Sequence, residues 1–133
     1  MQLDMAGTVK PLLPIRVLLE LLRYDLLFAL RGLPGVRPRR GPRTEGAGSG
    51  AMKWERAICE AVRSAAPFYW KPIRCLQRSI VTTRLMRMHG IPAEVVIGYR
   101  AAPFFSHAWV EVTGRVANDS PTYRMRLQIL ERF

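Results

Sequence analysis

Cysteine and histidine are scarce in this chain of 133 residues, which contains two of each. Two cysteines, Cys59 and Cys75, do not make a disulfide framework, so the sequence predicts reduced thiols and a cytoplasmic protein. No cluster of Cys and His has the spacing of a zinc site. We therefore expect neither a metal ion nor another cofactor.

Acidic side chains are also few: 10 Asp and Glu stand against 21 Lys and Arg, which gives a net charge of +11. Residues 1–50 hold 8 basic and 4 acidic residues, and residues 51–133 hold 13 and 6. The positive charge is therefore spread along the chain, and it favours acidic partners such as nucleic acid, anionic lipid or an acidic peptide. A recognition-helix motif and an aromatic RNA-binding signature are both missing, so a nucleic-acid ligand is not expected.

The sequence has no uncharged apolar run close to the ~20 residues that span a membrane. Its most hydrophobic stretch, residues 12–31, has no small-residue cleavage site directly after it. Four charged residues interrupt this stretch: Arg16, Glu20, Arg23 and Asp25. We predict a helix that ends at Gly32 and buries most of its circumference. The core or a partner is favoured over a membrane interface as the surface that covers it.

Glycine and proline dominate residues 32–50, which are predicted to form a basic linker. The chain is predicted to divide into residues 1–50, a helical N-terminal extension with this linker, and residues 51–133, a core domain. The core begins with an amphipathic helix over residues 51–66. This helix carries Cys59, which we expect to be structural.

Cys75 stands at the predicted start of a second helix. Apolar residues recur at helical spacing from Leu76 to Met88, and Gly90 suits the position after the helix end. Unpaired amides and the positive end of the helix dipole stabilise a thiolate at such a start, and the same amides can donate to an oxyanion. Taken alone, a small buried structural cysteine is the commoner alternative.

His107 lies in a predicted strand over residues 106–112. Alternation places His107, Trp109 and Glu111 on one face and small aliphatic residues on the other. The aliphatic face belongs in a core. A strand histidine is more often structural than catalytic, so His107 alone is a weak signal.

Asp119 follows a predicted turn at residues 113–114. A two-residue loop would place His107 opposite Ser120 and turn Asp119 away from it. A three-residue loop over residues 112–114 would place Asp119 opposite His107, with Cβ atoms about 5 Å apart. The three-residue loop is favoured, because the two-residue type I′ turn needs a positive φ at the β-branched Thr113. We therefore predict that this register brings the imidazole and the carboxylate within hydrogen-bonding reach.

Together with a strand predicted over residues 91–99, these elements indicate an α+β fold. Helices come first, and one of them carries a thiol. A small antiparallel sheet follows, and it carries an imidazole and a carboxylate. A thiol, an imidazole and a carboxylate in that order suggest a nucleophile, a base and a residue that orients the base.

Several segments resemble one family, the transglutaminase-like leader peptidases of lasso-peptide biosynthesis, called lasso peptide B proteins. The likeness is to the stand-alone peptidase half of the split form, and it covers roughly residues 51–120. The segments are Cys75-Leu-Gln-Arg-Ser79, His89-Gly-Ile-Pro-Ala-Glu-Val-Val-Ile-Gly98, His107-Ala-Trp-Val-Glu-Val112 and Asn118-Asp119. The resemblance implies a papain-like core, in which a nucleophile helix packs on the sheet. Cys75 would be its nucleophile, His107 its base and Asp119 its orienting residue.

The function implied by this resemblance is a cysteine peptidase that removes the leader from a lasso-peptide precursor. Hydrolysis, as opposed to transamidation, rests on the resemblance. The implied partners are the precursor peptide, a leader-binding protein called a RiPP recognition element, and a cyclase similar to asparagine synthetase. Residues 12–31 are the candidate docking surface for a partner, with Leu18 and Leu22 as test positions. The alternatives are a basic binding module and a catalytically inert scaffold in a biosynthetic complex.

Overall fold

The computed structural model describes the backbone of residues 2–36 and 49–133, and side chains from residue 13 onward within these ranges except at 33 and 49–52. The elements are α1 (Gln2–Arg31), α2 (Leu33–Val36), α3 (Ser49–Ala65), η1 (Ala66–Phe68), α4 (Cys75–Met88), β1 (Ala93–Ala101), β2 (Phe104–Val112), β3 (Arg115–Val116), α5 (Thr122–Arg126) and β4 (Gln128–Arg132). The strands form one four-stranded antiparallel sheet in the order β3-β2-β1-β4. This arrangement confirms the predicted α+β class.

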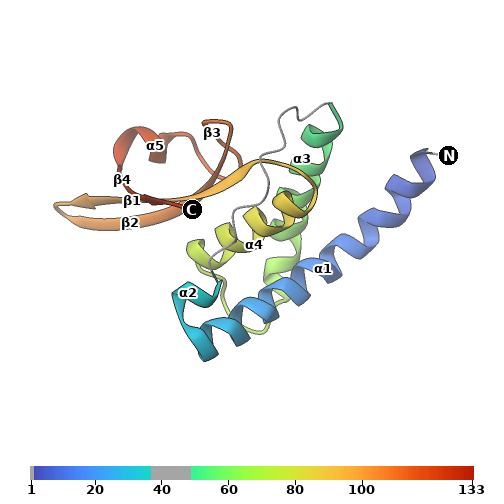
Figure 1. The fold of residues 1–133 in the computed structure, drawn as a ribbon, viewed down its shortest axis with the longest axis horizontal. Coiled ribbons are helices and arrows are strands. Elements are labelled where there is room, and N and C mark those ends of the chain that lie inside the picture. The colour runs from blue at the N-terminus through green and yellow to red at the C-terminus, as the bar shows by residue number, and fades with distance from the viewer. Residues whose placement is uncertain (1, 37–48) are drawn as a thin grey trace.

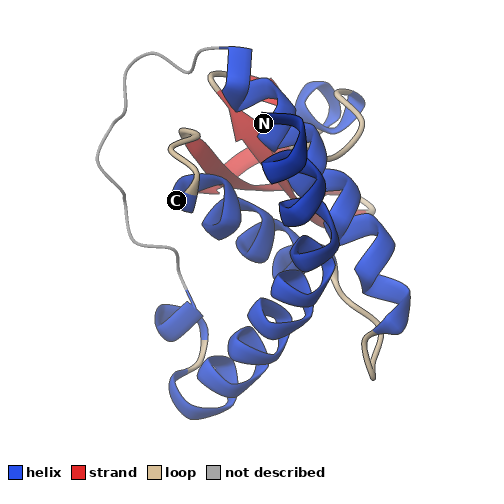
Figure 2. Ribbon diagram, turned by 90° about the vertical axis from the view of Figure 1, so that its right-hand side faces the viewer, coloured by secondary structure: helices blue, strands red, loops and turns tan. Residues whose placement is uncertain are grey.

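The helices and the sheet occupy separate layers. Figure 1 shows α1, α3 and α4 gathered together, with the β1–β2 hairpin projecting from them and α5 on the other side of the hairpin. Figure 2, seen from the helical side, shows the strands behind the helices. In the part of the chain that the structure describes, no helix combines the length and the apolarity of a membrane span.

α1 buries one face in the main core, whereas burial of most of its circumference was predicted. Leu13, Val17 and Leu21 join α3 and α4 in one apolar cluster, together with Ile58, Val62, Val81, Leu85, Met86, Val110 and Val112. The helix begins at Gln2 and not near residue 12, so Pro14 lies inside it.

The first residues of the predicted linker are helical and form α2. Val36 is buried there against Ile80 and Val95. Residues 33–36 are therefore helical where a linker was predicted, because burial of Val36 outweighs the local glycine and proline content. Residues 37–48 lie outside the described residues, and the division of the chain at residue 50 stays a prediction.

The two faces of the sheet pack against different parts of the chain. Val110 and Val112 face the helices, whereas Val96 and Trp109 meet Leu127 on the other face. Position 98, on that second face, has room only for glycine. A Cβ at this position would lie 2.6 Å from the Trp109 ring and 2.9 Å from the Leu127 Cβ, both too close for a side chain.

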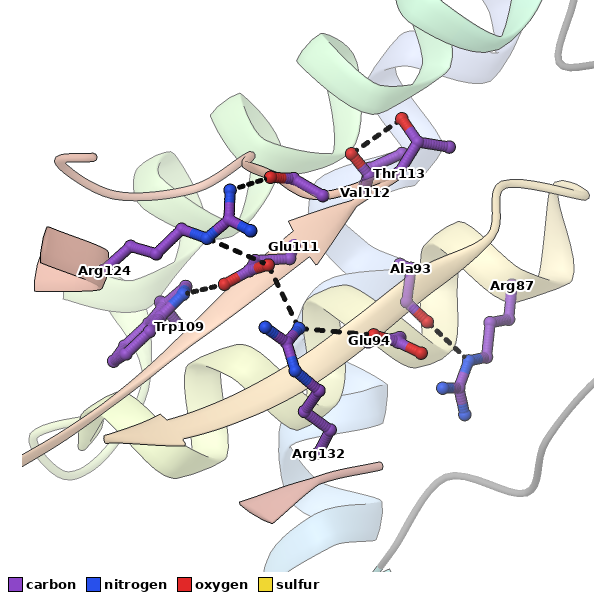
Figure 3. A network of polar contacts seen from close by, with 10 residues as sticks. Arg87, Ala93, Glu94, Trp109, Glu111, Val112, Thr113, Arg124 and Arg132 are labelled. Carbon is purple, nitrogen blue, oxygen red and sulfur yellow. Dashed lines mark hydrogen bonds and ion pairs between the residues drawn. The ribbon is translucent and has the colours of Figure 1, made fainter. Parts of the chain in front are cut away.

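A buried carboxylate ties α5 and β4 to the sheet (Figure 3). The Glu111 side chain is 1 % exposed, and its Oε2 accepts a hydrogen bond from Trp109 Nε1 at 2.8 Å. Its Oε1 lies 3.1 Å from an Arg132 guanidinium nitrogen and 3.8 Å from Arg124 Nε. Arg132 also reaches the exposed Glu94 at 3.5 Å. One acidic side chain on β2 thus holds both C-terminal elements.

We expect Glu111→Ala to lower the free energy of unfolding by about 2–4 kcal/mol, because it leaves the buried indole N–H of Trp109 without an acceptor and two arginines without their shared carboxylate. Urea denaturation measures this change. The matched control Glu94→Gln removes only an exposed ion pair and should cost less than about 1 kcal/mol. Equal losses in the two variants would contradict this role for Glu111.

Candidate active site

His107 and Asp119 meet in the structure. His107 Nε2 lies 2.7 Å from Asp119 Oδ2, and the two side chains are 16 % and 30 % exposed. The backbone N–H of Ser120 donates to the other carboxylate oxygen, Oδ1, at 2.8 Å. The carboxylate is therefore held from two sides. Because it engages Nε2, the second ring nitrogen, Nδ1, is the one available to exchange a proton with a reacting group.

The route to this contact differs from the predicted register. Val112 pairs with Arg115 and Glu111 with Val116, which is the register of the two-residue loop. Thr113 has a φ of 48° and Gly114 a φ of 81°, so Thr113 adopts the positive φ that we expected it to resist. The predicted three-residue loop is therefore wrong. The Thr113 hydroxyl donates to the Val112 carbonyl at 2.8 Å, a local bond that supports the turn.

Asp119 nevertheless reaches His107 because the β2–β3 ladder ends early. Ala117 N still donates to the Val110 carbonyl at 2.8 Å. One residue later, the side-chain Oδ1 of Asn118 accepts the bond from Val110 N, also at 2.8 Å, where a backbone carbonyl would continue the ladder. The chain leaves the strand path at this point, so strand alternation no longer directs Asp119 away from His107.

Aromatic rings surround the imidazole of His107. The Tyr123 ring of α5 lies 4.1 Å from it between centroids, and the rings of Phe105 and Trp109 lie at 6.2 and 6.3 Å. These contacts limit the rotation of the imidazole. Tyr123 was not among the predicted site residues, since its sequence signal is only an aromatic residue four positions after Asp119.

Cys75 is the first residue of α4 and is half-buried, with a free thiol. Arg74 precedes it in an extended conformation and makes no side-chain capping bond. The first N–H groups of any α-helix have no acceptor within the helix, so the start of α4 offers donors beside the thiol. The predicted placement of Cys75 at a helix start is therefore observed.

No hydrogen bond joins Cys75 to His107 in the part of the chain that the structure describes, and the polar contact of the imidazole is with Asp119. α4 packs on the face of the sheet that carries Val110 and Val112, whereas alternation along β2 places His107 with Trp109 on the other face. Two of the three predicted site residues are thus brought together, and the third begins the helix on the opposite face.

A cleft of about 530 Å³ opens beside Cys75, between α1, the loop before α4 and the first turn of α4. Its lining residues are Tyr24, Asp25, Phe28, Lys71, Pro72, Arg74, Leu76 and Gln77. Arg74 and Leu76 flank the cysteine in the chain. Burial, followed by the nearby Asp25 and Cys75, raises the pKa of the Tyr24 phenol. Clefts of this size accommodate several atoms of a bound peptide or small molecule.

Asp25 fastens the loop to α1 and so shapes the cleft. Its Oδ1 lies 2.7 Å from Lys71 Nζ, and its Oδ2 accepts a hydrogen bond from the Tyr69 hydroxyl. Burial and the bond to Asp25 raise the pKa of Tyr69 to about 12, so the phenol stays a donor at neutral pH. Asp25 is one of the four charged residues that interrupt the apolar stretch at residues 12–31, and that interruption was the available signal in the sequence.

A family model described as "Transglutaminase-like superfamily" matches residues 12–132 of the chain. The match covers most of α1 and every strand of the sheet. The chain belongs to the transglutaminase-like superfamily. The helix-then-sheet order described above is therefore that of a transglutaminase-like domain.

One curated relative of this transglutaminase-like chain is the "Microcin J25-processing protein McjB" of Escherichia coli. The two are 45 % identical over 56 residues, which is 42 % of this chain and 27 % of McjB, so the match spans about a quarter of the relative's length. No solved structure matches the chain. The family match and the relative together confirm the family resemblance predicted from the sequence.

The two thiols should differ in reactivity. Burial, with a smaller contribution from Glu55, raises the pKa of the Cys59 thiol to about 11. The Cys59 thiol also donates a hydrogen bond to the Ala117 carbonyl, with 3.7 Å between sulfur and oxygen. Only a thiolate reacts readily with alkylating agents, so folded Cys59 should resist iodoacetamide below about pH 10. Mass spectrometry of the alkylated chain should locate the modification at Cys75 at pH 7–8. Cys75→Ala is the control and should remain unmodified until urea is added; modification of its Cys59 under native conditions would contradict the prediction.

Proposed function

We propose that this protein is a cysteine peptidase that removes the leader from a lasso-peptide precursor. In this proposal Cys75 is the nucleophile, His107 the general base and acid, and Asp119 the residue that orients the imidazole. The observation that supports it most is the 2.7 Å contact between His107 and Asp119, which forms even though the strand register does not favour it. The superfamily match and the partial similarity to McjB supply the reaction class.

The reaction divides into acylation and deacylation. The Cys75 thiolate attacks the carbonyl carbon of the scissile peptide bond, and the oxyanion that forms accepts hydrogen bonds from the amides at the start of α4. The C–N bond breaks, and protonated His107 gives its proton to the leaving amine of the core peptide. Water then attacks the thioester while His107 accepts a proton. The C–S bond breaks, the leader leaves with a free carboxylate, and the Cys75 thiolate and protonated His107 are regenerated.

The proposal requires the Cys75 thiol and His107 Nδ1 to come within hydrogen-bonding reach during catalysis. Because α4 packs on the face of β2 opposite to His107, the proposal requires the first turn of α4 and the imidazole to move toward one another when the precursor binds. In this proposal the precursor occupies the cleft beside Cys75, where Tyr24 and Phe28 provide apolar surface and Arg74 provides positive charge. A leader-binding protein presents the precursor, and a cyclase similar to asparagine synthetase uses the amine that cleavage releases.

The first test is mass spectrometry of the precursor after incubation with this protein and its leader-binding partner. We expect one cut at the leader–core junction for wild type and no detectable cut for Cys75→Ala, since the nucleophile is gone. Cys59→Ala is the matched control and should cut normally. Cleavage that survives Cys75→Ala would exclude Cys75 as the nucleophile. No cleavage by wild type would favour a binding module or a scaffold.

Asp119→Ala should lower kcat by about 10²–10⁴-fold with little change in KM, because the imidazole loses the group that fixes its tautomer and orientation. Single-turnover cleavage assays measure this loss. Ser120→Ala is the matched control, because the Ser120 hydroxyl bonds to Thr122 and not to His107. Equal kcat values for the Asp119 variant and wild type would remove Asp119 from the proposed mechanism.

A further inference from the structure

One face of α1 carries an apolar stripe that the rest of the described chain leaves exposed. Ile15, Leu19, Leu22 and Leu26 are 55 %, 59 %, 44 % and 57 % exposed. Leucine and isoleucine side chains with such exposure usually occur singly on a soluble monomer, whereas a contiguous row of them marks a contact surface. We call these four residues the α1 stripe.

The spacing of the α1 stripe fits a helical partner. Its members follow one another at intervals of four, three and four residues, which is the pattern of the contact seam between two packed helices. The stripe is separate from the core side of α1, where Val17 and Leu21 are fully buried, and from the cleft, which is lined by Tyr24 and Phe28. Val17, Leu21, Tyr24 and Phe28 share one face of α1, which the core and the cleft account for, and the α1 stripe forms a second apolar face that they leave uncovered.

Charge on α1 indicates what kind of helix would fit. Arg16 and Arg23 are exposed and lie seven residues apart, so they stand on one edge of the stripe. Glu20 lies 3.8 Å from Arg23 but is closer to Arg84, at 2.8 Å, so the edge remains positive. The net charge of +11 on each copy opposes self-association, and it attracts an acidic surface.

The chain's own linker is a poor candidate to cover the stripe. Residues 37–48 contain four arginines, three glycines and two prolines, and Ala47 is their one residue of the aliphatic or aromatic types. Such a sequence supplies few apolar side chains, and its single acid, Glu45, is outnumbered by four arginines. The spacing of the stripe and the positive charge on its edge favour a helix from another molecule.

We propose that the α1 stripe docks an amphipathic helix of a partner protein, a helix with apolar residues at three- and four-residue spacing and acidic residues along one flank. Under the proposed function, the leader-binding protein supplies this helix, and the proposal rests on that function to this extent. The apolar seam provides affinity, while Arg16 and Arg23 set the orientation of the partner helix. Docking there places the partner on the helix that also forms a wall of the cleft beside Cys75.

The test is calorimetric titration of the full chain with the purified leader-binding protein. Leu19→Asp/Leu26→Asp should weaken binding at least tenfold, because both side chains would lie in the seam. Met125→Asp/Leu130→Asp is the matched control: these residues are 87 % and 65 % exposed but lie on α5 and β4, and binding should stay within twofold of wild type.

Leu18 is unsuitable as a test position, because it packs against the core. Arg16→Glu/Arg23→Glu should also weaken binding and should flatten its dependence on salt.

Each outcome supports or overturns the proposal. Wild-type affinity in Leu19→Asp/Leu26→Asp, or no binding by the wild-type chain, would overturn it. Self-association in sedimentation experiments, or binding to vesicles of phosphatidylglycerol and phosphatidylcholine, would also overturn it if the leucine substitutions abolish that association. Cys75→Ala should bind the partner as wild type does. If it does so while wild type fails to cut the precursor, the peptidase proposal fails and the docking surface stands.

Discussion

A carboxylate sealed inside a protein must be matched by nearby donors, and in this chain that constraint falls on Glu111. Its oxygens face an indole N–H from its own strand and guanidinium groups from α5 and β4. Since α5 also carries Tyr123 against the imidazole of His107, the same carboxylate that secures the C-terminal elements indirectly fixes the surroundings of the base. The geometry of the His107–Asp119 pair thus depends on an interaction that involves neither residue.

Much of the fold could be predicted, because its signals are local and periodic. Alternation along residues 106–112 predicted the two faces of β2, and the helical spacing of apolar residues from Leu76 to Met88 predicted α4. The hairpin register could not be predicted in this way. The preference against a positive φ at Thr113 is small and local, and it is outweighed by pairing along β2 and by the side chain of Asn118, which accepts a bond from Val110. A prediction from turn preferences alone does not include these longer-range hydrogen bonds.

The candidate site, too, could be predicted from the sequence only in part. The types of Cys75, His107 and Asp119 and their order could be read from the chain, because each stands beside a recognisable helix start, strand or turn. The cleft could not, because its wall comes from α1, which lies about fifty residues earlier in the sequence than Cys75. Asp25 was conspicuous as an acid among leucines. Its partners, Tyr69 and Lys71, become apparent only when α1 and the loop before α4 are brought together.

The close approach at Gly98 couples two positions that are eleven residues apart. Trp109 fills the volume that a Cβ on Gly98 would need, and Leu127 closes the same space from β4. A larger residue at position 98 requires a smaller residue at position 109, together with a shift of Leu127, whose Cβ would lie 2.9 Å from the added Cβ. Substitutions at the two positions should therefore arise together across relatives, and a designer who alters this face of the sheet has to treat Gly98 and Trp109 as a single unit.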